Sequence, residues 1–293
     1  MGMKTKAPTL RQFQDRFPTE DVCLDHLFQV RYGRDFECPG CGREARYTRV
    51  AGRRSYQCQW CANQVYPTAG TPFDRTRTPL RDWFFVMFQF CASRSGVAAK
   101  EVERQLGVTY KTAWRMCHEI RKYMGTLDGE SPIGGLGSIV EVDETFIGGY
   151  EREGQGGKGK TVVLGMKARG GDVVTKVVQN RRSGTLMPLI VQHVRPLSQV
   201  HTDELIGYGG LGMVNRFTHL TVNHSKGEYV SPKGVTVNGI EGFWAQLKRG
   251  INGTHIHVSA KHLPKYLAEF EFRHNRRQLP QGMLDEMLFS FPR

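Results

Sequence analysis

The order of apolar and polar positions divides the chain into a helical first part and a second part that opens with strands. Apolar residues at helical intervals predict a short helical lead-in within residues 1–35. The same spacing predicts a buried helix beginning near Thr78, followed by two helices separated at Gly107. We therefore expect a helix-turn-helix region over residues 78–124.

The second part follows a glycine-rich stretch from Gly125 to Gly137, which we interpret as a domain boundary. Alternating β-branched residues predict three successive strands, and Gly170-Gly171 predicts a hairpin between the last two. The predicted strands are 138–149, 160–169, 171–180, 199–205 and 217–224, and the predicted helices are 186–194, 239–249 and 260–277. This order predicts an α/β (α+β) domain over 138–293, with a mixed sheet flanked by helices.

Four of the seven cysteines form two tight pairs. Cys38 and Cys41 form one CxxC pair, and Cys58 and Cys61 form the other, with sixteen residues between the pairs. This spacing lets two knuckles present four thiolates to one zinc ion. Two disulfides or a redox pair are the alternatives, but a reducing compartment favours metal binding. We predict a zinc ribbon over residues 36–70, in which the ion replaces a hydrophobic core.

The overall charge narrows the choice of partner. The formal net charge is +13 and the sequence pI is about 9.6, which favours an abundant anionic partner such as nucleic acid. The sequence has neither a run of 18 apolar residues nor the pattern of a signal peptide. We therefore expect a cytoplasmic protein that is not bound to a membrane.

One face of the second helix in the helix-turn-helix region is basic. Its apolar stripe consists of Ala113, Cys117, Ile120 and Met124. The row expected on the opposite side consists of Lys111, Arg115, His118 and Lys122. Such a helix suits insertion into the major groove of DNA. The alternative is an ordinary solvated face, since charged rows are common.

Three acidic residues from separate predicted elements are candidates for one metal site. The pleat of the first strand places Asp143 on one face together with Glu141 and Thr145. Asp203 lies near the end of a short strand, and Glu241 lies near the start of a helix. Three clustered carboxylates are costly without cations, and two Mg²⁺ or Mn²⁺ ions would suit phosphodiester chemistry.

Each acid also has an ordinary interpretation. Asp143 and Asp203 can be surface acids at strand ends, while Asn238 and Glu241 match a capping box at a helix start. Lys248, seven residues after Glu241, is expected on the same helical side, where it can contact a phosphate.

A basic cluster formed by Arg273, Arg276 and Arg277 ends the last long predicted helix, and we expect it to contact phosphate.

Several motifs together resemble a known family. In order they are CPGC, CQWC, QLGVTYKTAWRMCHEIR, EVDETFIGG, HTDE, VNGIEGFWAQLKRGINGTHIHVS and EFRHNRR. This order resembles the bacterial insertion-sequence transposases of the IS1595 type, which have an ISXO2-like catalytic domain. The resemblance runs from about Phe17 to Arg277, and its most specific segments are EVDETFIGG and VNGIEGFW.

The resemblance implies an RNase H-like catalytic fold that cleaves and joins double-stranded DNA at terminal inverted repeats. It implies that Asp143 and Asp203 bind the catalytic metal. The third ligand is Glu241 or Asn238, and we prefer Glu241 because a carboxylate binds these ions better. Lys248, with Arg249 beside it, is expected to contact DNA.

Two other function classes fit the same sequence. One is a catalytically inactive DNA-binding regulator, which would bind DNA in a salt-sensitive way without cutting it. The other is a structure-selective nuclease or resolvase on the same fold. For a transposase we expect a homodimer or larger synaptic assembly, associated with the nucleoid and the target DNA.

Overall fold

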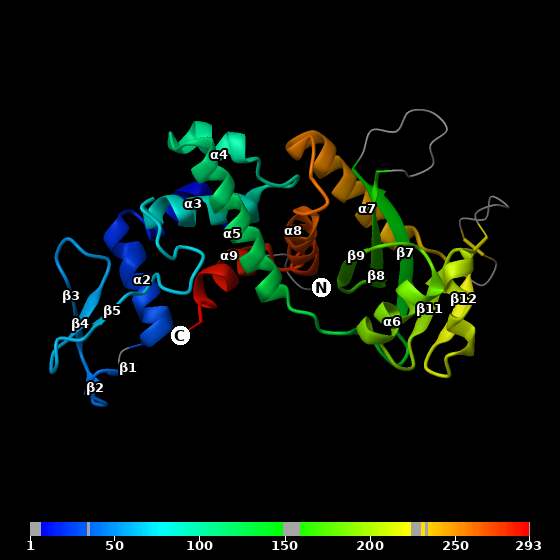
Figure 1. Cartoon of the computed structure of the whole chain (residues 1–293), viewed down its shortest axis with the longest axis horizontal. Coiled ribbons are helices and arrows are strands. Elements are labelled where there is room, and N and C mark those ends of the chain that lie inside the picture. Colours follow the sequence, from blue (N-terminus) through cyan, green and yellow to red (C-terminus); the bar gives the residue numbers. More distant parts are fainter. Residues whose placement is uncertain (1–6, 34–35, 149–158, 224–229, 232–233, 293) are drawn as a thin grey trace. The chain divides into compact units, whose positions relative to one another are not determined.

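The computed structural model describes residues 7–33, 36–148, 159–223, 230–231 and 234–292. The chain divides into two compact units (Figure 1). Unit 1 consists of Met1–Leu127 and Gln278–Arg293, and unit 2 consists of Asp128–Arg277. The predicted range of the catalytic domain, 138–293, therefore differs from unit 2 at both ends, most of all at the C-terminal end, where residues 278–293 belong to unit 1. Within the described ranges, no helix has the length and apolarity needed to cross a membrane.

Unit 1 is built around a helical core. Its helices are α1 (Leu10–Arg16), α2 (Glu20–Tyr32), α3 (Leu80–Ala92), α4 (Ala99–Leu106), α5 (Tyr110–Asp128) and α9 (Pro280–Phe289). Helix α9 packs on α3, and the Tyr123 hydroxyl donates to the Met287 carbonyl at 3.1 Å. The last helix thus completes the N-terminal core, which sequence order alone did not suggest.

The predicted break between two helices is present at Gly107. Gly107 ends α4 in the left-handed conformation, with φ 64°, where glycine carries no steric penalty. The Thr109 hydroxyl then accepts a hydrogen bond from the N–H of Thr112 in the first turn of α5. The predicted apolar stripe of α5 is fully buried: Ala113, Cys117, Ile120 and Met124.

The zinc-ribbon region has short strands. They are β1 (Phe36–Glu37), β2 (Glu44–Ala45), β3 (Tyr47–Arg49), β4 (Tyr56–Cys58) and β5 (Gln64–Val65). Strands β1 and β2 form a hairpin, and β3, β4 and β5 form an antiparallel sheet. Such short strands bury little apolar surface, which agrees with a module organised by an ion.

Unit 2 contains the mixed sheet expected from the sequence. Its five strands are β7 (Ile139–Ile147), β8 (Thr161–Ala168), β9 (Val173–Val178), β11 (Gln199–Thr202) and β12 (Thr218–Thr221). The spatial order is β12-β11-β7-β8-β9, in which β7, β8 and β9 are antiparallel while β11 is parallel to both β7 and β12. The short strands β6 (Ile133–Gly134) and β10 (Val194–Arg195) pair separately.

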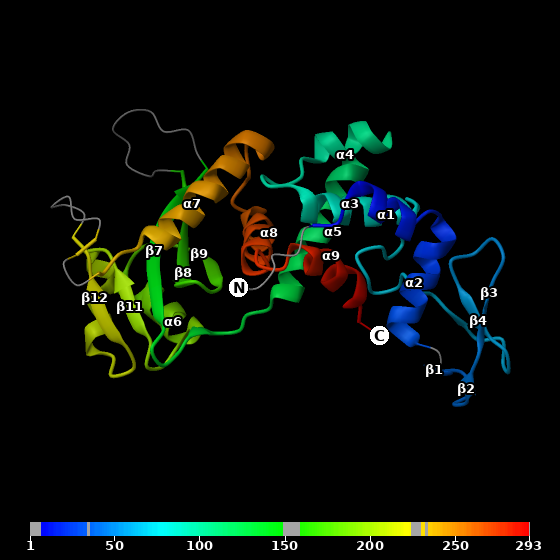
Figure 2. The ribbon, with the colours of Figure 1, turned by 180° about the vertical axis from the view of Figure 1, so that it is seen from behind.

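Helices cover both faces of this sheet (Figures 1 and 2). Helices α7 (Asn238–Gly250) and α8 (Leu263–Asn275) share a core with Val163 and Val173. Helix α6 (Ser183–His193) shares the opposite core with Leu164 and Val174. Neighbouring residues of one strand thus enter different cores, as the two-residue pleat requires.

Side chains of α8 bind the backbone of the edge strand β9. The carboxylate of Glu271 accepts hydrogen bonds from the N–H and hydroxyl groups of Thr175, and the Asn275 amide oxygen accepts one from the N–H of Val173. Burial is the main cause that raises the pKa of Glu271 to about 8, despite these hydrogen bonds. The helix thereby satisfies backbone donors that an open sheet edge would leave without strand partners.

We predict that Glu271 makes unit 2 less stable as the pH rises. The pKa of Glu271 is higher in the folded chain than its ordinary value of 4.5, so the folded state binds the proton more tightly than the unfolded state. The free energy of unfolding therefore falls as the pH rises from 4.5 to about 8. Glu271→Gln keeps an acceptor and removes the proton, so its unfolding free energy should depend less on pH across this window. Urea unfolding at several pH values measures this difference. Equal slopes in wild type and variant would contradict the prediction.

Candidate active site and zinc centre

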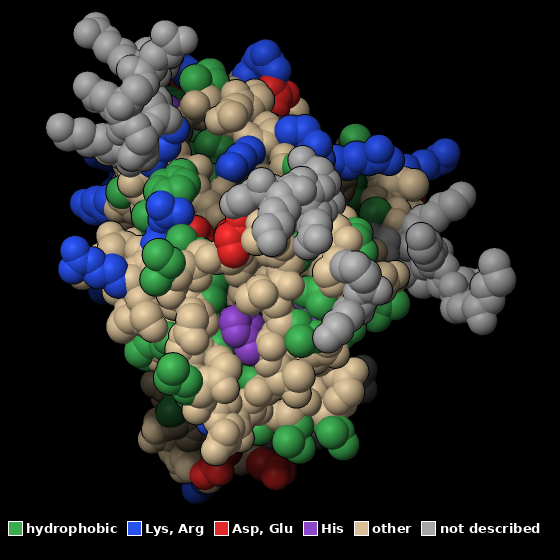
Figure 3. All heavy atoms as spheres, turned by 90° about the vertical axis from the view of Figure 1, so that its right-hand side faces the viewer, with side chains coloured by type: hydrophobic (Ala, Val, Ile, Leu, Met, Phe, Trp, Pro, Cys, Tyr) green, Lys and Arg blue, Asp and Glu red, His purple; other side chains and the backbone are tan. Residues whose placement is uncertain are grey.

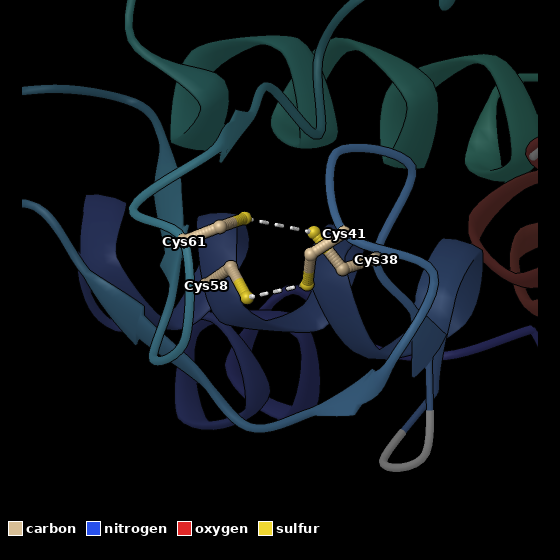
Figure 4. A group of neighbouring side chains, drawn as sticks. All are labelled: Cys38, Cys41, Cys58 and Cys61. Atoms are coloured by element: carbon tan, nitrogen blue, oxygen red, sulfur yellow. Dashed lines mark hydrogen bonds between the residues drawn. The ribbon is translucent and has the colours of Figure 1, made fainter.

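The four cysteines of the ribbon come together as predicted (Figure 4). Their sulfur atoms all lie within 4.8 Å of one another, with Cys38 Sγ 3.5 Å from Cys61 Sγ and Cys41 Sγ 4.0 Å from Cys58 Sγ. A tetrahedral zinc ion with Zn–S bonds of ~2.3 Å separates its sulfurs by ~3.8 Å. The four thiols therefore fit one structural zinc ion.

The two knuckles are built in the same way. In the first, the N–H of Gly40 donates to Cys38 Sγ, and in the second the N–H of Trp60 donates to Cys58 Sγ, both at 3.4 Å. Each turn is followed by a residue with positive φ, Gly42 at 65° and Ala62 at 60°. These backbone donors stabilise thiolates, the form in which cysteine binds zinc.

Strand pairing in unit 2 brings Asp143 and Asp203 to the same level of the sheet. Strands β7 and β11 run parallel, with Val140 opposite Val200 and Glu141 opposite His201. Continuing this register by two residues places Asp203, directly after β11, beside Asp143. The convergence therefore follows from strand pairing.

Helix α7 packs against β7 (Figure 2), and the charge of Glu241 on this helix acts on Asp143. At its start, the N–H of Ile240 donates to Glu141 Oε2 at 3.0 Å, and one turn later Trp244 Nε1 donates to Asp143 Oδ2 at 3.1 Å. Glu241 lies between these two contacts in sequence. The prediction that Glu141 and Asp143 share one face of β7 is confirmed, because both side chains accept hydrogen bonds from α7.

A glycine opposite Asp143 makes room for the tryptophan. Gly165 in β8 is the register partner of Asp143. A Cβ atom on Gly165 would lie 2.3 Å from Trp244 Cζ2 and 2.9 Å from Ile240 Cδ1, which is too close for real atoms. The indole can therefore reach the Asp143 carboxylate only because residue 165 has no side chain.

Electrostatics link the acids. The pKa of Asp143 is raised to about 7, chiefly because burial disfavours the charged form. The negative charges of Glu144, Asp203 and Glu241 raise it in the same direction. All three side chains thus act on Asp143 through space. Figure 3 shows acidic side chains near the middle of one face, with lysine and arginine side chains above them.

Carboxylates are the ligands that Mg²⁺ and Mn²⁺ prefer, so the donor set fits such an ion. Among the described residues, only the four cysteines already place three or more possible ligand atoms within 4.8 Å of one another. The acids are thus more widely spaced, and an ion would draw their side chains together.

The capping-box interpretation of Asn238 and Glu241 is wrong. The N-cap of α7 is Val237, so Asn238 already lies inside the helix, and its side chain is exposed. Glu141 from β7 accepts the hydrogen bond of the Ile240 N–H instead. Glu241 is half-buried, and its carboxylate is not held by the cap that the sequence suggested.

Comparisons with known proteins identify the family of this chain. The ISXO2-like transposase domain matches residues 135–275, and the transposase zinc-ribbon domain, also of the IS1595 type, matches residues 18–64. The chain belongs to the IS1595-type transposases.

Two relatives are similar to this transposase. A protein in transposable element ISH50 of Halobacterium salinarum is 26% identical over 277 residues, which cover 88% of this chain and 91% of the relative. A transposase-like protein of Haemophilus influenzae is 36% identical over 110 residues, which cover 36% of this chain and 84% of the relative.

Two buried glutamates of the transposase were not singled out as site residues from sequence. Glu144 accepts hydrogen bonds from the Tyr208 hydroxyl at 2.6 Å and from Arg181 at 3.1 Å, on the face opposite α7. Glu141 accepts from Arg169 as well as from Ile240. The signal was present in the strand itself, since EVDET places three acids in a strand whose other residues, apart from Thr145, are apolar.

The basic row of α5 is only partly as predicted. Lys111, Arg115 and Lys122 are exposed, but His118 is 2% exposed and its ring stacks on Trp114 at 3.7 Å. The prediction that His118 belongs to an exposed basic row is wrong, because the buried side of α5 is wider than the apolar stripe and also includes Met116 and Arg121. Three cations therefore remain on the outer face, where Arg115 also donates to the Asp74 carbonyl and Lys122 pairs with Glu119.

The arginines at the end of α8 bind protein groups. Arg273 pairs with Glu269, Arg276 pairs with Asp128, and Arg277 donates to the carbonyls of Gly170 and Gly171. These contacts hold the end of the helix to other parts of unit 2, so the three guanidinium groups already have protein partners, and the expected phosphate contact stays a prediction. Lys248 and Arg249, by contrast, are exposed on α7.

We predict that the ribbon holds one zinc ion per chain. Cys58→Ser should release the ion and lower the melting temperature of the transposase, because the short strands depend on the metal. Cys91→Ser is the matched control, since Cys91 is buried beside Met287 Sδ and outside the ribbon. Metal analysis of the purified proteins distinguishes the two variants. Equal zinc in wild type and Cys58→Ser would contradict the four-thiol site.

We also predict that Trp244 positions Asp143. Trp244→Phe removes a hydrogen bond to a carboxylate, a contact that contributes about 1.5–3 kcal/mol, and should weaken Mn²⁺ binding about tenfold or more. Gly165→Ala should weaken Mn²⁺ binding in the wild type by displacing the indole, but much less in a Trp244→Phe background, where the clashing ring atoms are gone. Calorimetric Mn²⁺ titration of the four proteins measures this coupling; additive effects would contradict it.

Proposed function

We propose that this transposase cleaves DNA at the terminal inverted repeats of its element and joins the ends to target DNA through Asp143, Asp203 and Glu241. The main support is the parallel register of β7 and β11, which puts Asp203 level with Asp143, next to the helix that carries Glu241. The raised pKa of Asp143 supports it further, because it reflects burial and nearby negative charge that a bound cation would offset.

Two divalent ions, Mg²⁺ or Mn²⁺, would supply activation of the attacking oxygen and stabilisation of the leaving oxygen. Asp143 would hold an ion from β7, the middle strand of the sheet, and the charges of Asp203 and Glu241 both act on it. Asp203 is held at the end of β11, where its Oδ1 accepts the N–H of Leu205 at 3.0 Å. Glu241 completes the set from α7, and Asn238 is the alternative third ligand.

The proposed DNA contacts lie in both units. In unit 1, the exposed Lys111, Arg115 and Lys122 on α5 would contact DNA at the terminal repeat. In unit 2, Lys248 and Arg249 would contact phosphates near the cleavage site. Joining two ends requires that both be held at once, so we infer a dimer or larger assembly on the DNA.

The test is nicking and joining of a labelled duplex that carries the element's terminal repeat, with Mg²⁺ or Mn²⁺. We expect Asp143→Asn and Asp203→Asn to bind this duplex like the wild type and to cut it at least about a thousandfold more slowly. Salt-sensitive binding by the wild type without any cutting would contradict the proposal and favour a DNA-binding regulator. Cutting without joining would favour a nuclease or resolvase.

The third ligand is decided by a matched pair of variants on the first turn of α7. Glu241→Gln should abolish cutting while Asn238→Ala, on the exposed side of the same turn, should cut close to the wild-type rate. The reverse result would assign the third ligand to Asn238 and leave Glu241 without a catalytic role.

A further inference from the structure

The chain after α7 makes a strained turn that exposes an isoleucine. Helix α7 continues into a π-helical turn, Ile251–His255, and Ile256 follows with φ 63° and ψ −53°. The N–H of His257 donates to the carbonyl of His255 at 2.6 Å across this residue, which defines the rare γ-turn with positive φ. A β-branched residue is seldom found in this conformation. Ile256 is nevertheless 83% exposed, so core packing does not explain the strain.

This isoleucine lies on the rim of a cavity of about 500 Å³. Apolar side chains form part of its wall, and cationic side chains form another part. The apolar wall includes Phe146, Ile147 and Val258, and the cations are Lys160 and Lys248. This volume falls within the range of pockets that bind small organic groups, about 300–1,000 Å³.

The cavity is close to the carboxylates along the same helix. Lys248 follows Glu241 by seven residues, which is two turns or roughly 10 Å along α7. The strand that carries Asp143 also ends at this cavity, because Phe146 and Ile147 belong to β7. A DNA strand with its scissile phosphate at the acids would therefore have neighbouring nucleotides at the cavity.

We propose that this cavity binds one unstacked nucleotide of the DNA strand beside the scissile phosphate, and that Ile256 occupies the gap left in the base stack. This inference rests on the proposed function. Apolar walls suit a base, and the ammonium groups of Lys160 and Lys248 suit its phosphate. Apolar side chains that project into DNA separate base steps in this way in other DNA-binding proteins.

The backbone of Ile256 allows a variant that removes the side chain's function without unfolding the chain. Asparagine tolerates positive φ much better than isoleucine, so Ile256→Asn relieves strain while it removes the apolar group. Leu197 provides the matched control, because it is 65% exposed with φ 66° and lies between β10 and β11. Neither substitution should lower the melting temperature.

The experiment uses a terminal-repeat duplex with 2-aminopurine at single positions next to the scissile phosphate. Wild type and Leu197→Asn should raise the fluorescence of one position several-fold on binding, and Ile256→Asn should not. Ile256→Asn should also nick the paired duplex roughly tenfold to a hundredfold more slowly. A duplex in which that nucleotide is unpaired should restore most of the rate, since the cost of unpairing it is then absent.

Failure of this inference is distinguishable from failure of the proposed function. The nucleotide site is overturned if the wild type nicks the duplex but the 2-aminopurine fluorescence rises at no position. It is also overturned if Ile256→Asn matches Leu197→Asn both in its nicking rate and in the rise of 2-aminopurine fluorescence. If the wild type does not nick any duplex, paired or unpaired, the proposed function itself fails.

Discussion

The burial of one carboxylate, Asp143, among other acids is the constraint that shapes the candidate site of unit 2. Asp143 lies on the central strand, where burial and three neighbouring acids raise its pKa to about 7. Its side chain keeps one orientation because Trp244 donates to it and Gly165 leaves space for the indole. A fold that gathers acids in this way is relieved by a proton or a cation. This is the physical reason to interpret the cluster as a metal site rather than as surface charge.

The same parts of the fold position the cluster and support it. Glu141, two residues before Asp143, accepts the N–H of Ile240 and so fixes the start of the helix that carries Glu241. Glu144, on the opposite face, pairs with Arg181 and accepts a hydrogen bond from the Tyr208 hydroxyl. Three acids of one strand therefore have different partners. Only Asp143 is left facing the other candidate ligands.

The sequence was most informative where the physical rule is local. Cysteine spacing predicted the ribbon, and two-residue alternation placed Asp143 on the correct face of β7. Local rules failed where distant segments decide the outcome. The match of Asn238 and Glu241 to a capping box was misleading, because Glu141 from β7 accepts the Ile240 N–H and α7 begins at Asn238 itself. Helical spacing placed His118 among exposed cations, but its ring is buried and stacks on Trp114. The role of Gly165 could not be inferred at all, since it depends on a side chain 79 residues away, Trp244.

The most direct test of the account is where Mn²⁺ binds in a crystal of the transposase with its terminal-repeat DNA, located by anomalous scattering. The account predicts Mn²⁺ held by Asp143, Asp203 and Glu241, next to the scissile phosphate. Mn²⁺ ions bound elsewhere, or a site in which Asp143 is not a ligand, would contradict it.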